Sequence, residues 1–227
     1  MRKLVGIFLA VLFCSQMSSA MAEGQRSITQ KNLYVFDGSL NDAHLFARVE
    51  NTGDEPINLD AGQLVIFDKE DNIVDTSSYI RAYPTYLRPG EYAYAEDWSF
   101  IDAKSDDIGD YKFSISTTKI SEETTYFECE ASYNAGDFNS EYDDYIYVTF
   151  TNTTDQTVYG IYVVAAVLDE EGNILYVSED CASSLGVHSG SSITKRISVD
   201  SDFAEYFQRK NIKPKTVDAL VYIENRK

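Results

Sequence analysis

The sequence has few of the residues on which catalysis and metal binding usually depend. It contains two histidines, His44 and His188, and three cysteines among 227 residues. It has no CxxC pair and no HExxH, Walker or GxGxxG motif, which excludes zinc, metalloprotease, nucleotide and dinucleotide sites in their sequence-recognisable forms. Because the two histidines lie in different halves of the chain without a partnered motif, we expect them to be ordinary polar residues and the protein not to be an enzyme.

Basic residues are also scarce, with 19 lysines and arginines against 37 acidic residues and a net charge of −18. A field of this sign repels nucleic acid and anionic lipid, so we expect no nucleic-acid partner. It also favours solubility outside the cell. Beyond the first residues no apolar run has the length of a membrane helix, so we expect no membrane insertion.

The chain begins with the features of an export signal. Arg2 and Lys3 precede an apolar run from Leu4 to Phe13, and small residues ending at Ala22 suit signal-peptidase cleavage. The alternative, lipidation of Cys14, is disfavoured by the bulky Phe13 before it. We therefore expect residues 1–22 to be a signal peptide and the protein to be secreted or extracellular, or periplasmic in a Gram-negative source. Loss of Arg2 and Lys3 leaves 17 bases against 37 acids, a net charge of −20.

The remaining sequence reads as two copies of one unit. At a fixed offset of 101 residues, positions 51–74 align with 152–175 without a gap, and seven of the 24 pairs are identical. Such self-similarity is the sequence signature of duplication. We place an N-terminal domain at residues 26–118 and a C-terminal domain at 124–227, each long enough for one core.

Within each unit the pattern is that of β-strands. Leu45, Ala47 and Val49 alternate with larger or polar residues, as do Ile146 and Val148, which is typical of half-buried strands. Turn signals separate such runs, so we predict an all-β fold of two tandem immunoglobulin-like antiparallel β-sandwiches. The runs 63–67 and 161–168 are almost continuously apolar and predict central strands covered on both faces.

One segment, residues 200–211, departs from the strand pattern. Asp200 or Ser201 can cap a helix there, and Phe203, Tyr206 and Phe207 fall on one side of it. We predict a short helix in the second domain, docked on its own sheet.

Short motifs in both units resemble a known family. The first unit has Val49-x-Asn51-Thr52, a strand ending Ile66-Phe67-Asp68, and later Pro89-Gly90, and the second has Phe150-x-Asn152-Thr153, Val167-Leu168-Asp169 and Gly190. These resemble the FxLYD-type immunoglobulin-like modules of exported bacterial proteins. Both copies depart from the pattern, with Leu64 and Ala165 where the family has its leading Phe. The resemblance implies the fold and no particular reaction.

The repeated phrase DKEDNIV and DEEGNIL could be a calcium loop or a hairpin. Asp68, Glu70 and Asn72 occupy alternate positions as calcium ligands do, but Ile73 stands where an EF-hand loop requires Gly. In the second copy Gly172 suits the left-handed residue of a type I turn with a bulge. We favour the hairpin and keep calcium as the only cofactor to test.

Aromatic residues suggest a binding function, since the chain has 17 tyrosines and 12 phenylalanines. Tyr145 and Tyr147 point away from the predicted core and are our candidates for stacking on a sugar ring, although they may equally be ordinary cross-strand neighbours. The alternation in residues 92–100 predicts a core face, with a carbohydrate platform as the alternative. The aromatic residues on this face are Tyr92, Tyr94, Trp98 and Phe100.

The two cysteines beyond the signal, Cys129 and Cys181, leave two alternatives open. An exported chain with an even number of cysteines can form a disulfide, and two free thiols are the other outcome.

Taken together, the sequence predicts a non-catalytic binding or structural protein whose partner is an extracellular protein or glycan. A carbohydrate-binding protein using exposed tyrosines is the second hypothesis, and a polysaccharide hydrolase with a pair of carboxylates across the domain junction is the third.

Overall fold

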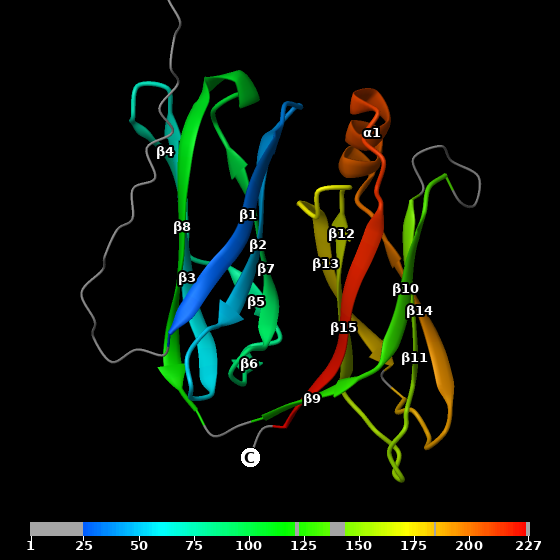
Figure 1. The fold of residues 1–227 in the computed structure, drawn as a ribbon. Coiled ribbons are helices and arrows are strands. Elements are labelled where there is room, and N and C mark those ends of the chain that lie inside the picture. The colour runs from blue at the N-terminus through cyan, green and yellow to red at the C-terminus, as the bar shows by residue number, and fades with distance from the viewer. Residues whose placement is uncertain (1–24, 121–122, 137–143, 184, 226–227) are drawn as a thin grey trace, which may run out of the picture.

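The computed structural model describes residues 25–120, 123–136, 144–183 and 185–225. The expected signal peptide, residues 1–22, lies outside this part of the chain. The described strands form four antiparallel sheets, accompanied by one α-helix (Figure 1). The all-β class predicted from the sequence is confirmed.

Two of the sheets are built from residues 26–119 and enclose one core. The first sheet has the strand order β1-β2-β7-β5, and the second has the order β4-β3-β6 with β8 paired along β3. Buried Leu45, Val49, Leu64, Ile66 and Phe113 meet between them. The strands are β1 (Arg26–Phe36), β2 (Asn41–Asn51), β3 (Ile57–Asp68), β4 (Ile73–Ser77), β5 (Arg81–Tyr83), β6 (Tyr86–Leu87), β7 (Tyr92–Ile101) and β8 (Ile108–Lys119), with a 3₁₀ turn η1 (Ser105–Asp107) before the last. We call this the N-terminal sandwich.

The other two sheets are built from residues 123–225. One has the order β13-β12-β15-β9 and the other β10-β11-β14. Ile146, Val148 and Phe150 of the second sheet face the buried residues of β12. The strands are β9 (Glu123–Phe127), β10 (Cys129–Asn134), β11 (Tyr145–Thr151), β12 (Ile161–Leu168), β13 (Ile174–Ser183), β14 (Ser192–Ser198) and β15 (Thr216–Asn225). We call this the C-terminal sandwich.

The predicted helix is present as α1 (Ser201–Lys210). Asp200 caps it by accepting a hydrogen bond from the backbone N–H of Asp202, and Asn211 ends it in the left-handed conformation. Phe203 and Phe207 are fully buried. The helix docks on more than its own sheet, because Phe203 also packs against aromatic side chains of the N-terminal sandwich.

One buried asparagine holds an equivalent turn in each sandwich. The side-chain amide of Asn51 donates to two backbone carbonyl groups at 2.9 and 3.0 Å, and its oxygen accepts a backbone N–H at 3.0 Å. Asn152 makes the same three bonds at 2.8, 2.8 and 3.0 Å. The partners are Glu55, Leu87 and Gly53 in the first turn, and Gln156, Val187 and Thr154 in the second. Each turn satisfies its buried polar groups from within.

The two continuously apolar runs differ in their surroundings. Residues 163–167 of β12 are all fully buried, so both faces of this strand are covered as predicted. In β3 the burial alternates, with Leu64 and Ile66 buried and Val65 and Phe67 partly exposed. The prediction for β3 is therefore wrong: its outer face is open to solvent, and Lys112 lies 5.0 Å over the Phe67 ring.

Candidate functional site

The two sandwiches pack against each other through one sheet each. The outer face of β1-β2-β7-β5 lies against the sheet that contains β12 and β13 (Figure 1). Buried Phe46 and Tyr94 of the N-terminal sandwich belong to the same apolar cluster as Val164, Ala166 and Tyr176 of the C-terminal sandwich. This contact is what covers the second face of β12.

Hydrogen bonds between side chains and backbone fix the register of this junction. Asn32 and Tyr34 on β1 both donate to the carbonyl oxygen of Ile174, at 2.6 and 2.9 Å. Tyr92 and Tyr94 on β7 both donate to Asp218 Oδ2 on β15, at 2.8 and 2.6 Å. Burial and the bond to Asp218 raise the pKa of both tyrosines, so they remain neutral donors.

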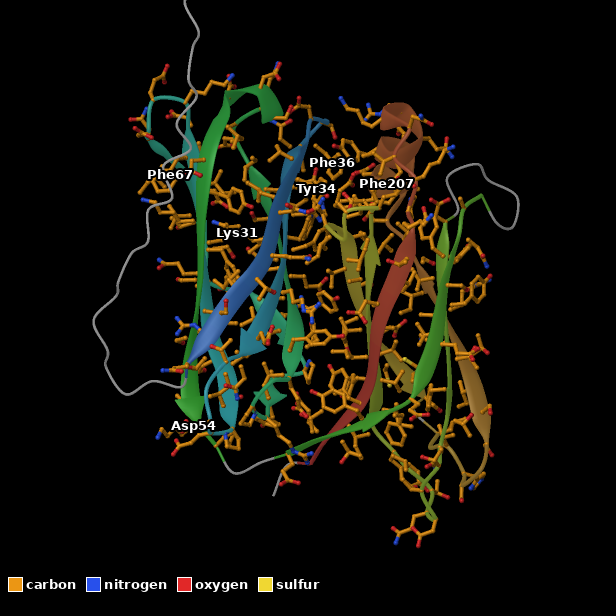
Figure 2. The ribbon with its side chains drawn as sticks, viewed as in Figure 1. Lys31, Tyr34, Phe36, Asp54, Phe67 and Phe207 are labelled. Atoms are coloured by element: carbon orange, nitrogen blue, oxygen red, sulfur yellow. The ribbon has the colours of Figure 1, made fainter. Side chains whose placement is uncertain are left out.

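An aromatic cluster closes the junction at α1. Phe203 contacts Tyr34, Phe36, His44 and Phe46, with ring centroids 4.8 to 5.4 Å apart and mostly edge-to-face. Figure 2 shows Tyr34 and Phe36 on β1 extending toward the helix that carries Phe207. Such pairs add about 0.5 to 1.5 kcal/mol each beyond their buried area, so the helix ties the sandwiches together.

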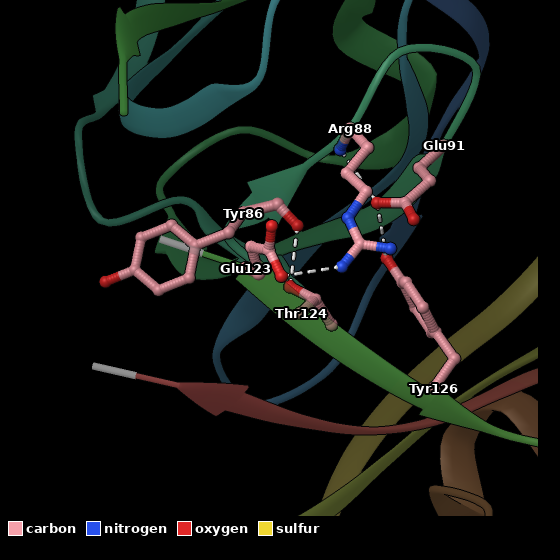
Figure 3. A network of polar contacts seen from close by, with 6 residues as sticks. All are labelled: Tyr86, Arg88, Glu91, Glu123, Thr124 and Tyr126. Atoms are coloured by element: carbon pink, nitrogen blue, oxygen red, sulfur yellow. Dashed lines mark hydrogen bonds and ion pairs between the residues drawn. The ribbon is translucent and has the colours of Figure 1, made fainter. Parts of the chain in front are cut away.

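The opposite end of the junction is held by a polar network around β9 (Figure 3). Arg88 pairs with Glu123 at 3.0 Å, and Thr124 Oγ1 donates to the carbonyl oxygen of Tyr86 at 2.7 Å. Tyr126 donates to Glu91, whose carboxylate also accepts the backbone N–H of Arg88. The pair of Arg88 and Glu123 is exposed and contributes little by itself, but the network places β9 against the turn before β7.

A groove opens between the sandwiches where β5 approaches β12. It has a volume of about 540 Å³ and is lined by residues of both sandwiches. We call it the tyrosine groove and define it by Tyr83, Tyr159, Tyr162, Tyr222, Glu179 and Glu224. This volume lies within the range of small-molecule sites.

Two tyrosine rings offer exposed surface in the tyrosine groove. Tyr162 is 41% exposed and stacks on the buried Tyr222, with centroids 5.9 Å apart and planes inclined by 29°. Tyr159 is 65% exposed and lies over Gly186, where a Cβ would be only 2.5 Å from its Cε1. Gly186, with φ of +75°, therefore leaves the space that the Tyr159 ring occupies.

Two carboxylates, those of Glu179 and Glu224, also line the tyrosine groove. Glu224 accepts hydrogen bonds from the backbone N–H and the hydroxyl of Thr85, both at 2.6 Å, and so joins the two sandwiches. Glu179 is half-buried, and its pKa is raised by burial, by Asp180 and by Glu224, while Arg81 lowers it. The groove thus combines flat aromatic surface with hydrogen-bond acceptors.

A second, smaller hollow lies on the same junction near α1. It has a volume of about 170 Å³. We call it the Trp98 hollow and define it by His44, Tyr79, Arg81, Glu96, Asp97 and Trp98. Trp98 is 54% exposed and Tyr79 is 85% exposed, so both rings stand at its rim.

The carboxyl groups of the Trp98 hollow are removed from water. Burial raises the pKa of Glu96 to about 7, with Arg81 acting against this and Glu179 and Asp97 adding to it. Asp97 is only 7% exposed, and its pKa is also raised, mainly by burial. Its side chain lies on the same face of β7 as Ala93 and Ala95, inside the N-terminal sandwich, where it hydrogen-bonds Ser77 while its Oδ2 is buried without a partner. A buried acceptor of this kind costs stability unless a donor reaches it.

The prediction that the aromatic residues of positions 92–100 face the core of their own sandwich is wrong. Ala93 and Ala95 are fully buried in the core of the N-terminal sandwich, whereas Tyr92 and Tyr94 face the other sandwich and Trp98 and Phe100 are more than half exposed. Small residues can line a core when large ones cross from the opposite sheet. The large residues of β7 serve the junction and the surface instead.

Tyr145 and Tyr147 lie on the outer face of β11, opposite the fully buried Ile146 and Val148, as expected. Both are half-buried, with ring centroids 6.4 Å apart. The Arg196 guanidinium lies 4.6 Å over the Tyr145 ring and occupies the face that a sugar would need. This pair is therefore a poorer platform than the tyrosine groove.

Asp68 and Asn72 serve the hairpin between β3 and β4. Asp68 Oδ1 accepts the backbone N–H groups of Glu70 and Asn72, and its Oδ2 accepts the Asn72 side chain at 2.9 Å. These bonds, led by Asn72, lower the pKa of Asp68. Asp169 makes the same three bonds in the second copy. Among the described residues no group of three or more histidines, cysteines or acids is arranged to hold a metal ion.

The turn conformation predicted for this hairpin is confirmed. Asp71 has φ of +64° and Gly172 has φ of +82°, and each donates its N–H back to the aspartate that opens the turn. A register shift follows in both hairpins, as a bulge requires.

Cys129 and Cys181 are both free thiols in the structure. Cys129 Sγ donates to the carbonyl oxygen of Ala219 on β15, while Cys181 lies on β13, two strands away. Cys129 itself lies on β10, in the other sheet of the C-terminal sandwich. Of the alternatives left open by the sequence, the structure therefore has the free thiols.

Sequence reasoning missed the groove residues for identifiable reasons. Tyr162 lies inside the apolar run 161–168, where every residue was expected to be covered, yet it is exposed. Tyr159 precedes Gly160, a glycine with positive φ that marks a turn just before β12. Glu179 and Glu96 come from different sandwiches and meet only at the junction, so no local spacing could reveal them.

No protein-family model matches this chain, and no curated protein resembles it significantly. The resemblance of each unit to the FxLYD-type modules stays a prediction. No described helix is long and apolar enough to cross a membrane.

Proposed function

We propose that this protein is an exported, non-catalytic binding protein that holds a carbohydrate in the tyrosine groove. The observation that carries the proposal is the Tyr162 ring, which is 41% exposed on one side and stacked on buried Tyr222 at 5.9 Å. A ring fixed in this way presents a flat apolar surface without paying further conformational entropy on binding.

The chemistry of the tyrosine groove suits a sugar. The apolar faces of pyranose rings pack on aromatic side chains, and their hydroxyl groups donate to carboxylates. Tyr159 and Tyr162 supply the first kind of surface, and Glu179 supplies acceptors of the second kind. The acidic chain, with net charge −18, favours a neutral or basic glycan over a sulfated or phosphorylated one.

The arrangement of the sandwiches supports a binding role rather than a flexible tether. Contacts at both ends of the junction, around Phe203 and around Arg88, keep the groove walls in place. Preorganised walls favour affinity because little is lost to ordering when the ligand arrives. The proposal includes export directed by residues 1–22 and an origin of the two sandwiches by duplication. The matching hydrogen bonds of Asn51 and Asn152 support the duplication.

A glycan array followed by calorimetry on the best binder tests the proposal. Tyr162→Ala should weaken binding about tenfold or more, since it removes the stacking surface, and Tyr162→Phe should bind almost normally. Tyr147→Ala, on the outer face of β11, is the control for loss of an exposed tyrosine elsewhere. Binding that depends on Tyr147 and not on Tyr162 would move the site to the outer face of β11, and the absence of any glycan ligand would remove the proposal.

A hydrolase is the second candidate function. Glu96 on β7 and Glu179 on β13 interact across the junction, and both have a raised pKa, as a general acid requires. Glu96 lines the Trp98 hollow whereas Glu179 lines the tyrosine groove, so the two carboxyl groups open on different spaces. Release of reducing ends from a polysaccharide by the purified protein, abolished in Glu179→Gln, would favour the hydrolase over the binding protein.

A further inference from the structure

The tyrosine groove and the Trp98 hollow lie along one continuous stretch of the chain. From Tyr79 to Tyr83 every second residue is buried in the core of the N-terminal sandwich. The other three, Tyr79, Arg81 and Tyr83, therefore share the outer face of β5 and of the residues just before it. Tyr79 and Arg81 line the Trp98 hollow, and Tyr83 lines the tyrosine groove. One outer face thus connects the two spaces.

The pairing of β5 with β7 places Trp98 on the same face. Tyr83 lies opposite Tyr94, and residues directly opposed in an antiparallel pair point to the same side. Trp98 is four residues farther along β7, so its side chain points to this side as well. At about 3.3 Å per residue, the two positions on β7 are about 13 Å apart.

Each end of this face carries an aromatic ring that is held in place and partly exposed. At the groove end Tyr162 stacks on Tyr222. At the other end the indole N–H of Trp98 donates to Asp42 at 3.2 Å, and Phe100 packs against the indole with ring centroids 4.7 Å apart. A ring fixed in this way offers a flat apolar surface and loses little entropy when a ligand binds.

Polar groups lie between the two rings. Arg81 is exposed and hydrogen-bonds the Tyr83 hydroxyl. Glu179, from the facing sandwich, lies within electrostatic range of Arg81 and lines the tyrosine groove. A guanidinium group has five donors, and a carboxylate accepts several hydrogen bonds. The stretch between the rings therefore offers both donors and acceptors, and the hydroxyl groups of a sugar chain can use both.

We propose that the glycan held in the tyrosine groove is an extended, neutral, β-1,4-linked chain that continues along the outer face of β5 and stacks a second sugar ring on Trp98. This role of Trp98 rests on the proposed function, because Tyr162 holds the first ring. The rings of a β-1,4-linked chain follow one another in a nearly straight line, as the residues of a strand do. The net charge of −18 disfavours an anionic chain.

The single tryptophan of the chain provides the test. Because Trp98 is the only tryptophan, intrinsic fluorescence reports on this end of the face alone. Cellohexaose or chitohexaose should change the Trp98 emission in a saturable way. The same hexasaccharide should bind about tenfold or more tighter than cellobiose or chitobiose, which are too short to stack on both rings. Maltohexaose, whose α-1,4-linked chain is curved, should give neither effect.

The outcomes separate this proposal from the carbohydrate site itself. A hexasaccharide that binds without changing the Trp98 emission, or no more tightly than its disaccharide, would overturn the extended site and leave the tyrosine groove as a carbohydrate site. An equal response to maltohexaose would overturn the requirement for an extended chain. Binding of neither cellohexaose nor chitohexaose would also overturn the proposal, whereas the proposed function would still depend on the glycan array.

Matched variants locate the two ends of the ligand. Trp98→Ala should lower the affinity for the hexasaccharide to about that for the disaccharide and leave disaccharide binding unchanged, whereas Tyr162→Ala should weaken both. Tyr147→Ala, on the outer face of β11, should change neither. Equal losses for both chain lengths in Trp98→Ala would refute a contact at the far end. If circular dichroism shows that Trp98→Ala is misfolded, calorimetry on Tyr79→Ala decides, because Tyr79 is 85% exposed on the same rim. A loss of about threefold or more for the hexasaccharide alone supports the proposal, and unchanged affinity refutes it.

Discussion

Glu96 offers a direct measurement of how the junction affects stability. Its carboxyl group lies between the two sandwiches, where burial raises its pKa from 4.5 to about 7 and Glu179 on the facing strand adds to the effect. Replacing it by glutamine keeps the size of the side chain and removes the ability to ionise. We therefore expect Glu96→Gln to change the pH dependence of unfolding more than any single substitution on the outer surface.

The sign and size follow from proton linkage. Below pH 4.5 the carboxyl group is protonated in both the folded and the unfolded protein, so ionisation costs nothing. Between pH 4.5 and about 7 only the unfolded protein ionises, and the folded state loses stability. The loss is complete above about pH 7 and amounts to at most about 3.5 kcal/mol, at about 1.4 kcal/mol per pH unit.

Urea unfolding at a series of pH values between about 4 and 8 measures this effect. The free energy of unfolding of Glu96→Gln, minus that of the unchanged protein, should rise by about 2 to 3 kcal/mol across the series. Glu70→Gln, in the exposed hairpin, is the control for loss of one negative charge. A difference for Glu96→Gln that stays constant with pH would refute the reasoning, because it would mean that the carboxyl group is solvated in the folded state.

Four further outcomes are expected. Asp71→Gly should stabilise the protein by about 0.5 to 1 kcal/mol in urea unfolding, because Asp71 has φ of +64°. Millimolar calcium should leave the melting temperature unchanged, since the hairpin itself uses the carboxylate of Asp68; a rise would restore the calcium loop. A thiol reagent should label exposed Cys181 quickly and Cys129 slowly without reductant, and failure of both to react would indicate a disulfide. Asn152→Ala should cost about 2 to 3 kcal/mol in the same unfolding assay, because it leaves buried backbone groups unpaired.

The elements that follow from local pattern could be predicted from the sequence. The alternation at Leu45, Ala47 and Val49 identified the buried face of β2, because a strand places every second residue on one side. Asp200 identified the start of α1 because its side chain accepts a free backbone N–H of the first turn. Gly172 identified a hairpin because its left-handed conformation suits few other residues.

The errors arise where the two sandwiches meet. A tyrosine that packs on a neighbouring sandwich has the same alternation as one that packs on its own core, so Tyr92 and Tyr94 were assigned to the wrong side. The continuously apolar run of β12 correctly predicted that both faces of this strand are covered. A strand with one face open to solvent normally carries polar residues on that face. What the pattern could not specify was the covering surface, which is built from residues of β2 and β7 in the other half of the chain.

The burial of both faces of β12 has a practical consequence for anyone who wishes to divide the protein. The C-terminal half, expressed alone, would expose Val164, Ala166 and Tyr176 as a contiguous apolar surface on its sheet. That surface would favour self-association, and the isolated piece would lack the wall that Tyr83 contributes to the tyrosine groove. Both halves of the chain therefore contribute to one buried junction, and the tyrosine groove is formed by the pair rather than by either half.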